Sequence, residues 1–149
     1  MKGRHKARIA ALQALYEIDC AQHKPDIVLA HRLEAGTLSD DVVQFCHHLT
    51  MGVLTHQIIL DEFIHRHAPE WPLEQMAFID RNILRMAIFE FAVDGSTPIK
   101  VAINEAVELA KTFGSESAPR FINGVLGALV EYQDMIQKAA QAFEEKDTQ

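Results

Sequence analysis

The stretch PIKVAINEAVELAKTFGSESAPRFINGVLGAL, residues 98–129, decides the fold class of this 149-residue chain. Apolar side chains recur in it every three or four residues, which is the spacing of amphipathic helices and not of strands. Gly114 is expected to end a first helix in a left-handed cap. Ser117 is expected to cap a second helix that has Pro119 in its first turn. The stretch therefore predicts two consecutive helices joined by a short loop.

The same periodicity continues outward along the chain in both directions. Apolar stripes at helical spacing predict five earlier helices, and the helix after Ser117 is expected to continue to about residue 136. The second of the earlier helices is expected to end at Gly36, and Ser39 is expected to cap the third. No alternation of apolar and polar residues typical of a strand occurs. The earlier helices are expected around residues 7–18, 27–33, 42–53, 58–63 and 76–91, which makes the chain an all-α bundle of about seven helices.

The segment APEWP, residues 68–72, is the strongest break in this pattern. Two prolines within five residues end a helix and start a new one. A chain of this length is expected to form one domain. We therefore expect a single domain with an N-terminal subdomain of about residues 1–68, a C-terminal subdomain of about residues 72–139 and a polar tail at residues 140–149.

Composition excludes several classes of protein. Charged residues interrupt every apolar run well short of the roughly 18 residues that a membrane span needs, and the N-terminus lacks the apolar segment of a secretory signal. Cys20 and Cys46 are isolated and have no C-x-x-C spacing, so they are expected to be reduced thiols of a cytoplasmic protein. The pairs His47-His48 and His65-x-His67 lack the spacing of metal ligands on a helix. No catalytic motif is found, and we expect no metal, no cofactor and no enzymatic activity.

Charge is distributed very unevenly along the chain. The formal net charge is −7, from 14 basic and 21 acidic residues. The first eight residues carry four of those bases and no acid, so this basic N-terminal segment is +4 and the rest of the chain is −11. Such a segment on an acidic body is a footprint for phosphate, although a frayed, solvated terminus is the alternative. The acidic body also suits a basic protein partner.

Polar residues also interrupt the apolar helix around residues 76–91. Arg81 and Arg85 lie on one face of it, and buried polar groups need partners. We expect them to form structural ion pairs or to bond to loop carbonyls. Further polar or small residues within apolar helices are expected to have architectural roles, Gly124 by allowing helices to approach closely and Asn104 and Asn123 by bonding to neighbouring backbone groups.

Four segments resemble the NusB family of transcription antitermination factors. They are RHKARIAALQALY (residues 4–16), DRNILRMAIFEF (80–91), the stretch at 98–129 and, more weakly, FCHHLTMGVLTHQIILDEFI (45–64). The resemblance implies an all-helical fold of two packed three-helix subdomains without catalytic activity. It also implies a protein that binds the boxA element of ribosomal-RNA leader transcripts together with a small-subunit ribosomal protein, NusE, in a complex with other Nus factors and RNA polymerase. A free homodimer is left open.

The resemblance and the chemistry of the residues select the same candidate surface. Sequence-specific RNA recognition combines phosphate contacts with stacking on aromatic rings. Arg4 and Arg8, one helical turn apart, are expected to face one strand of phosphates. Tyr16, further along that helix, could stack on a base or contact the partner, with core packing as the alternative. The RNA-binding candidates are Lys2, Arg4, His5, Lys6, Arg8, Tyr16, Arg120 and Phe121, and the partner-binding candidates are Tyr16, Asp80 and Ser117.

The sequence departs from the family pattern at several of these positions. His5 and Lys6 stand where arginines are usual, and Ile9 replaces a frequent acid. Lysine cannot form the bidentate contacts of arginine, so RNA binding is expected to be weaker or more dependent on pH. Ser117 replaces a common aspartate, and the loss of that negative charge should raise RNA affinity modestly.

Two other interpretations stay open at this point. A NusB-like domain also precedes the catalytic domain of a ribosomal-RNA cytosine methyltransferase, but this sequence has no cofactor motif, so we do not expect that enzyme. The chain could also be a protein-interaction module or homodimer in which the basic N-terminal segment is incidental. Binding to a basic ribosomal protein without binding to RNA would favour the module.

Overall fold

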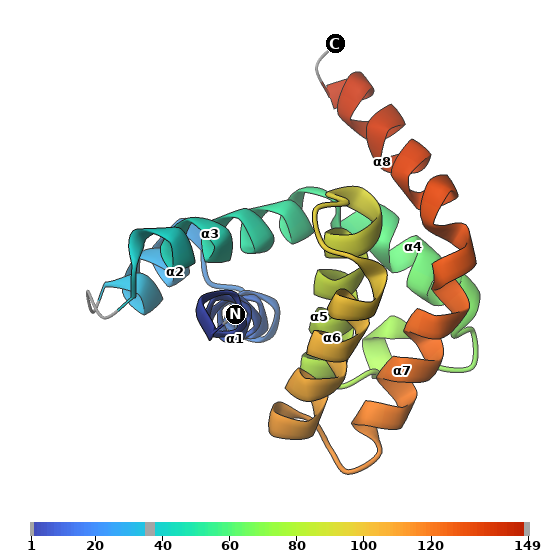
Figure 1. The fold of residues 1–149 in the computed structure, drawn as a ribbon, viewed down its shortest axis with the longest axis horizontal. Coiled ribbons are helices and arrows are strands. Elements are labelled where there is room, and N and C mark those ends of the chain that lie inside the picture. Colours follow the sequence, from blue (N-terminus) through green and yellow to red (C-terminus); the bar gives the residue numbers. More distant parts are fainter. Residues whose placement is uncertain (1, 35–37, 148–149) are drawn as a thin grey trace.

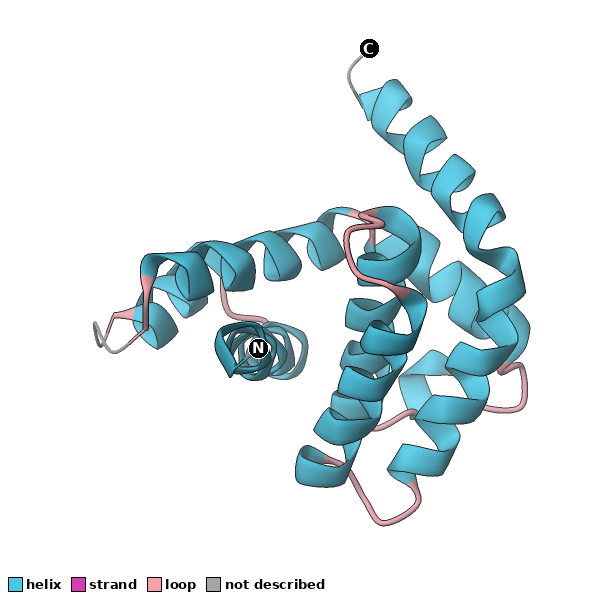
Figure 2. Ribbon diagram, viewed as in Figure 1, coloured by secondary structure: helices cyan, strands magenta, loops and turns pink. Residues whose placement is uncertain are grey.

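The computed structural model describes residues 2–34 and 38–147, with the side chains of Lys2 and Asp147 left out. The described residues form helices and no strand (Figure 1, Figure 2), which confirms the all-α prediction. No helix among them is long and apolar enough to cross a membrane. Gly36 lies outside the described residues. The helices are α1 (Lys2–Ala21), α2 (Pro25–Leu33), α3 (Asp40–Thr55), α4 (Gln57–His67), α5 (Phe78–Ile88), α6 (Ile99–Phe113), α7 (Ala118–Leu129) and α8 (Gln133–Asp147), with short 3-10 or π turns η1 (Leu73–Gln75), η2 (Phe89–Val93) and η3 (Val130–Tyr132).

The helices share one apolar core. Helix α1 packs against α2, α3 and α5, and α5 in turn packs against α6 and α7. In Figure 1, α1 is seen end-on beneath α3, with α5 and α6 beside it. Helix α4 precedes the break at residues 68–72 but packs against α5, α7 and α8. The division into two subdomains at that break stays a prediction. The largest fully buried side chains come from both halves of the chain and include Leu12, Leu15, Leu49, Leu60, Ile83, Phe91 and Leu126.

The ends of the helices test the predicted caps. Ser39 caps α3, because its side chain accepts a hydrogen bond from the backbone N–H of Val42. The left-handed cap predicted at Gly114 is wrong, since its φ of −93° and ψ of −178° are extended. Glycine is needed there for space: a Cβ would lie 2.7 Å from the Cβ of Ala118. Ser117 precedes α7 but its side chain forms no capping bond, because its φ of −87° and ψ of −8° are helical.

The polar tail predicted at residues 140–149 is helical as far as Asp147. Helix α8 continues to Asp147, and Ala140 is buried in the contact with the rest of the molecule. The carboxylate of Glu144 lies 2.8 Å from Nε2 of His56, which follows α3. This contact and the partly buried Phe143 fasten the outer half of α8. The architectural roles expected for three residues are also not found, since all are exposed: Asn104, Asn123 and Gly124.

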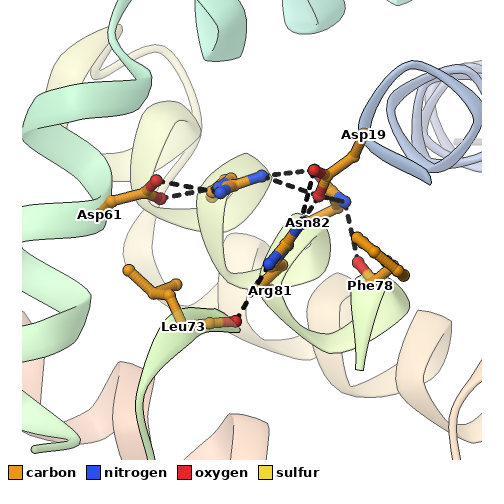
Figure 3. A network of polar contacts seen from close by, with 7 residues as sticks. Asp19, Asp61, Leu73, Phe78, Arg81 and Asn82 are labelled. Atoms are coloured by element: carbon orange, nitrogen blue, oxygen red, sulfur yellow. Dashed lines mark hydrogen bonds and ion pairs between the residues drawn. The ribbon is translucent and has the colours of Figure 1, made fainter. Parts of the chain in front are cut away.

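A network of charged side chains fastens α5 to its neighbours (Figure 3). The guanidinium group of Arg81 donates to both carboxylate oxygens of Asp19 on α1, at 2.7 and 2.6 Å, and to the carbonyl of Leu73 at 3.0 Å. Arg85 donates to both oxygens of Asp61 on α4, at 2.7 and 2.9 Å, and also reaches Asp19 at 3.1 Å. The predicted structural ion pairs and the bond to a loop carbonyl are confirmed.

Asp19 is the point that the two arginines share. Burial of its carboxyl would raise the pKa, but hydrogen bonds from Arg81 and Asn82 and the charges of both arginines lower it below its ordinary value. A lowered pKa in the folded state means that the ionised carboxylate stabilises the fold above the unfolded pKa. That stabilisation is lost as the pH falls through the folded pKa. The network therefore contributes most at neutral pH.

We expect Asp19→Ala to lower the free energy of unfolding by about 3–5 kcal/mol at pH 7, because it leaves two largely buried guanidinium groups short of their partner. Below the folded pKa of Asp19, the difference from the wild type should shrink. Urea unfolding at several pH values measures both effects. Glu62→Ala is the matched control, since it breaks the exposed Glu62–Arg66 pair and should change stability by less than about 1 kcal/mol. Equal effects of the two substitutions would contradict this account of the network.

Candidate nucleic-acid interface

Arg8 does not lie on the surface. Its side chain is buried, with a residue exposure of 3%, and its guanidinium group contacts both oxygens of Glu90 at 2.7 to 3.1 Å. Glu90 is buried as well and also accepts a hydrogen bond from the hydroxyl of Thr97 at 3.0 Å. A guanidinium group engaged in this way has no free face for a phosphate. The prediction that Arg4 and Arg8 together face one strand of phosphates is therefore wrong for Arg8.

The π-helical turn η2 brings Glu90 to this position. Asp94 donates its backbone N–H to the carbonyl of Phe89 at 2.8 Å, a bond to the fifth residue back that adds a residue to the turn. The extra residue directs Glu90 toward α1 and lets Phe89 cover Gly52 on α3, where a Cβ would lie 2.2 Å from the ring. Arg8 is held by this local geometry, which sequence periodicity does not reveal.

The rest of the basic N-terminal segment divides into paired and unpaired residues. Nδ1 of His5 lies 2.8 Å from a carboxylate oxygen of Glu105 on α6, and its ring is partly exposed. Arg4 and Lys6 are exposed, and neither forms an ion pair with a residue that the structure describes. The side chain of Lys2 lies outside the described residues. Arg4 and Lys6 are therefore the described cations of this segment that remain available to a ligand.

Arg4 contacts an aromatic ring of α3. Its guanidinium carbon is 4.3 Å from the ring centroid of Phe45 on α3, which is a cation–π contact. Phe45 is only half-buried, at the edge of the apolar stripe of α3. An open groove of about 630 Å³ lies beside this pair, and its lining residues are Gly3, Arg4, Ser39, Asp41, Val42, Gln44, Phe45 and His48.

Tyr16 lies on the surface, so the core-packing alternative for it is wrong. The residue is 39% exposed and meets the edge of the Phe78 ring, with 6.3 Å between the ring centroids. Phe78 starts α5 and is itself covered on one face by the guanidinium group of Arg81. Lys6, Gln13 and Tyr16 share the outer side of α1, since they are spaced by seven and three residues. Unpaired positive charge and aromatic surface thus lie along one helix.

Asp80 is partly buried beside the loop between α6 and α7. One of its carboxylate oxygens is inaccessible to solvent and has no hydrogen-bond partner among the described residues. It lies 3.4 Å from the place where a Cβ on Gly114 would be. Burial raises the pKa of the Asp80 carboxyl above its ordinary value. Asp80 therefore holds a carboxylate that the free protein leaves unsatisfied.

Arg120 and Phe121 lie on α7 beside a second groove, of about 370 Å³. Phe121 meets the edge of Trp71, with 6.1 Å between ring centroids, and Trp71 is 57% exposed. Ser117 is exposed in the preceding loop, with its hydroxyl 3.4 Å from that of Ser115. Sequence reasoning missed the exposed rings of Trp71 and Phe78. Their positions could have indicated this exposure, because Trp71 precedes a proline and Phe78 starts a helix. A bulky aromatic residue at such a place is not fixed in a core.

The sequence can now be compared with those of known proteins. The model of the NusB family matches residues 5–131. The chain belongs to the NusB family. The NusB transcription antitermination protein of Dehalococcoides mccartyi (strain CBDB1) is 51% identical over 126 residues, which cover 85% of this chain and 88% of that protein. The resemblance to the NusB family is confirmed.

Solved structures place this NusB family member in the same fold. The NusB of T. maritima has a TM-score of 0.78 at 29% identity, covering 91% of this chain and 90% of its own. A chain of the antitermination factors NusB and NusE in complex with double-stranded RNA also has a TM-score of 0.78, at 26% identity, covering 93% of this chain and 98% of its own. These likenesses confirm the NusB-like fold.

Arg8 and Arg4 should respond differently to substitution. We expect Arg8→Leu to lower the free energy of unfolding by about 3–5 kcal/mol in the absence of any ligand, because it leaves the buried carboxylate of Glu90 without its charge partner. Arg4→Leu removes an exposed group and should change stability by less than about 1 kcal/mol. Urea unfolding of the two variants measures this difference. A stable Arg8→Leu protein would show that the ion pair with Glu90 is not structural.

Asp80→Asn should stabilise the free protein at neutral pH, by about 1 kcal/mol, because it removes a charge that burial disfavours. The sign follows from the raised pKa: the folded protein favours the neutral carboxyl, so ionisation destabilises the fold above the ordinary value of 3.8. The gain should vanish at a pH low enough to protonate Asp80 in the wild type. Thermal melting at pH 7 and pH 3 measures it, and a lower melting temperature of the variant at pH 7 would contradict the argument.

Proposed function

We propose that this NusB family member binds single-stranded RNA of the boxA type together with the ribosomal protein NusE, and so supports antitermination on ribosomal-RNA transcripts. The observation that supports this most is the exposed surface of α1: Lys6 shares its outer side with the exposed ring of Tyr16, and the exposed Arg4 lies against Phe45 of α3. A NusB of the same fold was solved in complex with NusE and double-stranded RNA. Other Nus factors and RNA polymerase are the expected members of the assembled complex.

The exposed aromatic rings favour a single strand over a duplex. In an RNA duplex the bases are stacked on each other, so a protein reads mainly phosphates and 2′-hydroxyls. Unpaired bases instead stack on rings such as those of Tyr16, Phe78 and Phe121, while the acidic body repels phosphates elsewhere. We propose that Arg4, Lys6 and Arg120 contact phosphates, with Lys2 as a further candidate. His5 would contribute through its partly exposed ring.

The partner surface is proposed around the start of α5 and the loop before α7. Asp80 lies there and is only partly buried, and we propose that its carboxylate attracts a lysine or arginine of a basic ribosomal protein. Tyr16 and Phe78 supply apolar area next to it, and exposed aromatic residues are typical of contact surfaces. Ser117 lies in the loop that Asp80 faces and is proposed to contact the same partner.

A second function is favoured by one observation. Arg8 and His5 pair with internal carboxylates, which leaves less free positive charge at the start of α1 than the sequence suggests. A protein that binds only NusE, with a basic segment that serves the fold, would have the same contacts. Binding to RNA in solution separates the two functions.

Fluorescence anisotropy with a boxA-like RNA, a scrambled strand and the corresponding duplex tests the proposal, with and without NusE. We expect preference for the boxA-like strand. Each phosphate contact contributes a slope near −0.7 in log K against log salt, so Arg4→Ala with Lys6→Ala should flatten the slope by roughly one to one and a half units. Lys138→Ala with Lys146→Ala, which removes the same charge from α8, is the matched control. Equal affinity for all three RNAs, or an unchanged slope, would contradict RNA binding at α1, and binding of NusE alone would support the second function.

A further inference from the structure

We propose that the groove between the start of α1 and α3 holds one base of the bound RNA, stacked on the pair formed by Arg4 and Phe45. The inference rests on the proposed RNA-binding function and adds a base-binding site on α3 to it. The apolar stripe of α3 gave no reason to place a ligand contact on that helix. Three observations support this site: the cation–π pair, the shape of the groove and the charges around it.

Arg4 and Phe45 together form the platform. The guanidinium carbon of Arg4 lies 4.3 Å from the ring centroid, Arg4 is exposed and Phe45 is half-buried. The buried Arg8 approaches the same ring, with its guanidinium carbon 5.4 Å from the centroid. Guanidinium planes and aromatic rings are the surfaces on which proteins stack unpaired bases.

The groove beside the platform has the size and walls of a small-ligand site. Its volume of about 630 Å³ lies within the roughly 300–1,000 Å³ of small-molecule sites. Gly3 lets the first turn of α1 lie close to α3, because a Cβ there would be only 3.3 Å from a methyl group of Val42. A larger residue at this position would narrow the entrance.

The charges of the groove select a base and not a phosphate. Asp41 lines it and, with Asp40, starts α3, so a phosphate inside the groove would face negative charge. A neutral base meets no such repulsion. Carboxylate and amide groups accept hydrogen bonds from the exocyclic amino groups of bases. Asp41 and Gln44 therefore favour a base that carries an amino group.

The test couples a substitution in the protein with a deletion in the RNA. Wild-type protein and Phe45→Leu, each with NusE, are titrated with a boxA-like RNA and with a set of strands that each lack one base. Stacking on one ring contributes enough that Phe45→Leu should weaken binding of the complete strand by about 5- to 150-fold. With the strand that lacks the stacked base, both proteins should bind equally, and with every other strand the difference should persist. The slope of affinity against salt should not change, because no phosphate contact is lost.

Two variants separate stacking from structure. Phe45→Tyr keeps the ring and should restore the wild-type affinity. Phe143→Leu truncates a partly buried phenylalanine on α8 and should leave RNA binding unchanged, even where it lowers the melting temperature as much as Phe45→Leu does.

Each failure has a different meaning. Equal binding of the complete strand by wild type and Phe45→Leu, or an equal loss for every strand of the set, would overturn the base site and leave the proposed function intact. Weaker binding of NusE by Phe45→Leu without RNA would assign the groove to a protein and overturn it as well. A wild type that does not prefer the boxA-like strand over the scrambled one would overturn both the proposed function and this inference.

Discussion

Two ion pairs hold α1 against α5, and the packing of both helices depends on them. Arg8 on α1 meets Glu90 after the end of α5, in a pair that is buried. Asp19 on α1 meets Arg81 near the start of α5, in a pair that is partly buried. The two helices cross, because α1 is viewed along its axis in Figure 1 whereas α5 lies across the view. Two ionic contacts at separate points of each helix fix the position of α1 against α5.

Basic residues of α1 that look alike in the sequence have different roles in the structure. Among the described basic residues at the start of α1, Arg8 is buried whereas Arg4 and Lys6 are exposed. Arg8 neutralises a buried carboxylate and thereby allows Glu90 to lie in the core, where an unpaired charge would be strongly destabilising. Arg4 and Lys6 carry no such task. Because its ion pairs hold α1 in place, Arg4, Lys6 and Tyr16 have their positions before RNA binds. The surface proposed for RNA is therefore preformed.

The sequence predicted those features of the fold that depend on the local spacing of residues. Apolar residues every three or four positions identified helices along the chain, but they merged α7 and α8 into one helix that ended near residue 136. Arg81 and Arg85 within one helix required internal partners, which the structure confirms. The sequence could not predict that Arg8 is buried, because its partner Glu90 lies 82 residues away and is brought into reach by a π-helical turn. The candidate surface was predicted only as a set of positions. The continuation of α8 could have been predicted, since Ile136, Ala140 and Phe143 extend the apolar stripe by steps of four and three residues.

Asp19 and Asp80 show how the surroundings of a carboxyl group set its pKa. Both are partly buried, so burial raises the pKa of each. At Asp19, hydrogen bonds and two arginines overcome this effect and lower the pKa, whereas at Asp80 nothing opposes it. A carboxyl group buried without a partner is unfavourable in the free protein when it is ionised. A fold optimised for stability alone would have a neutral residue at position 80. This aspartate is the residue that we propose for contact with a basic partner.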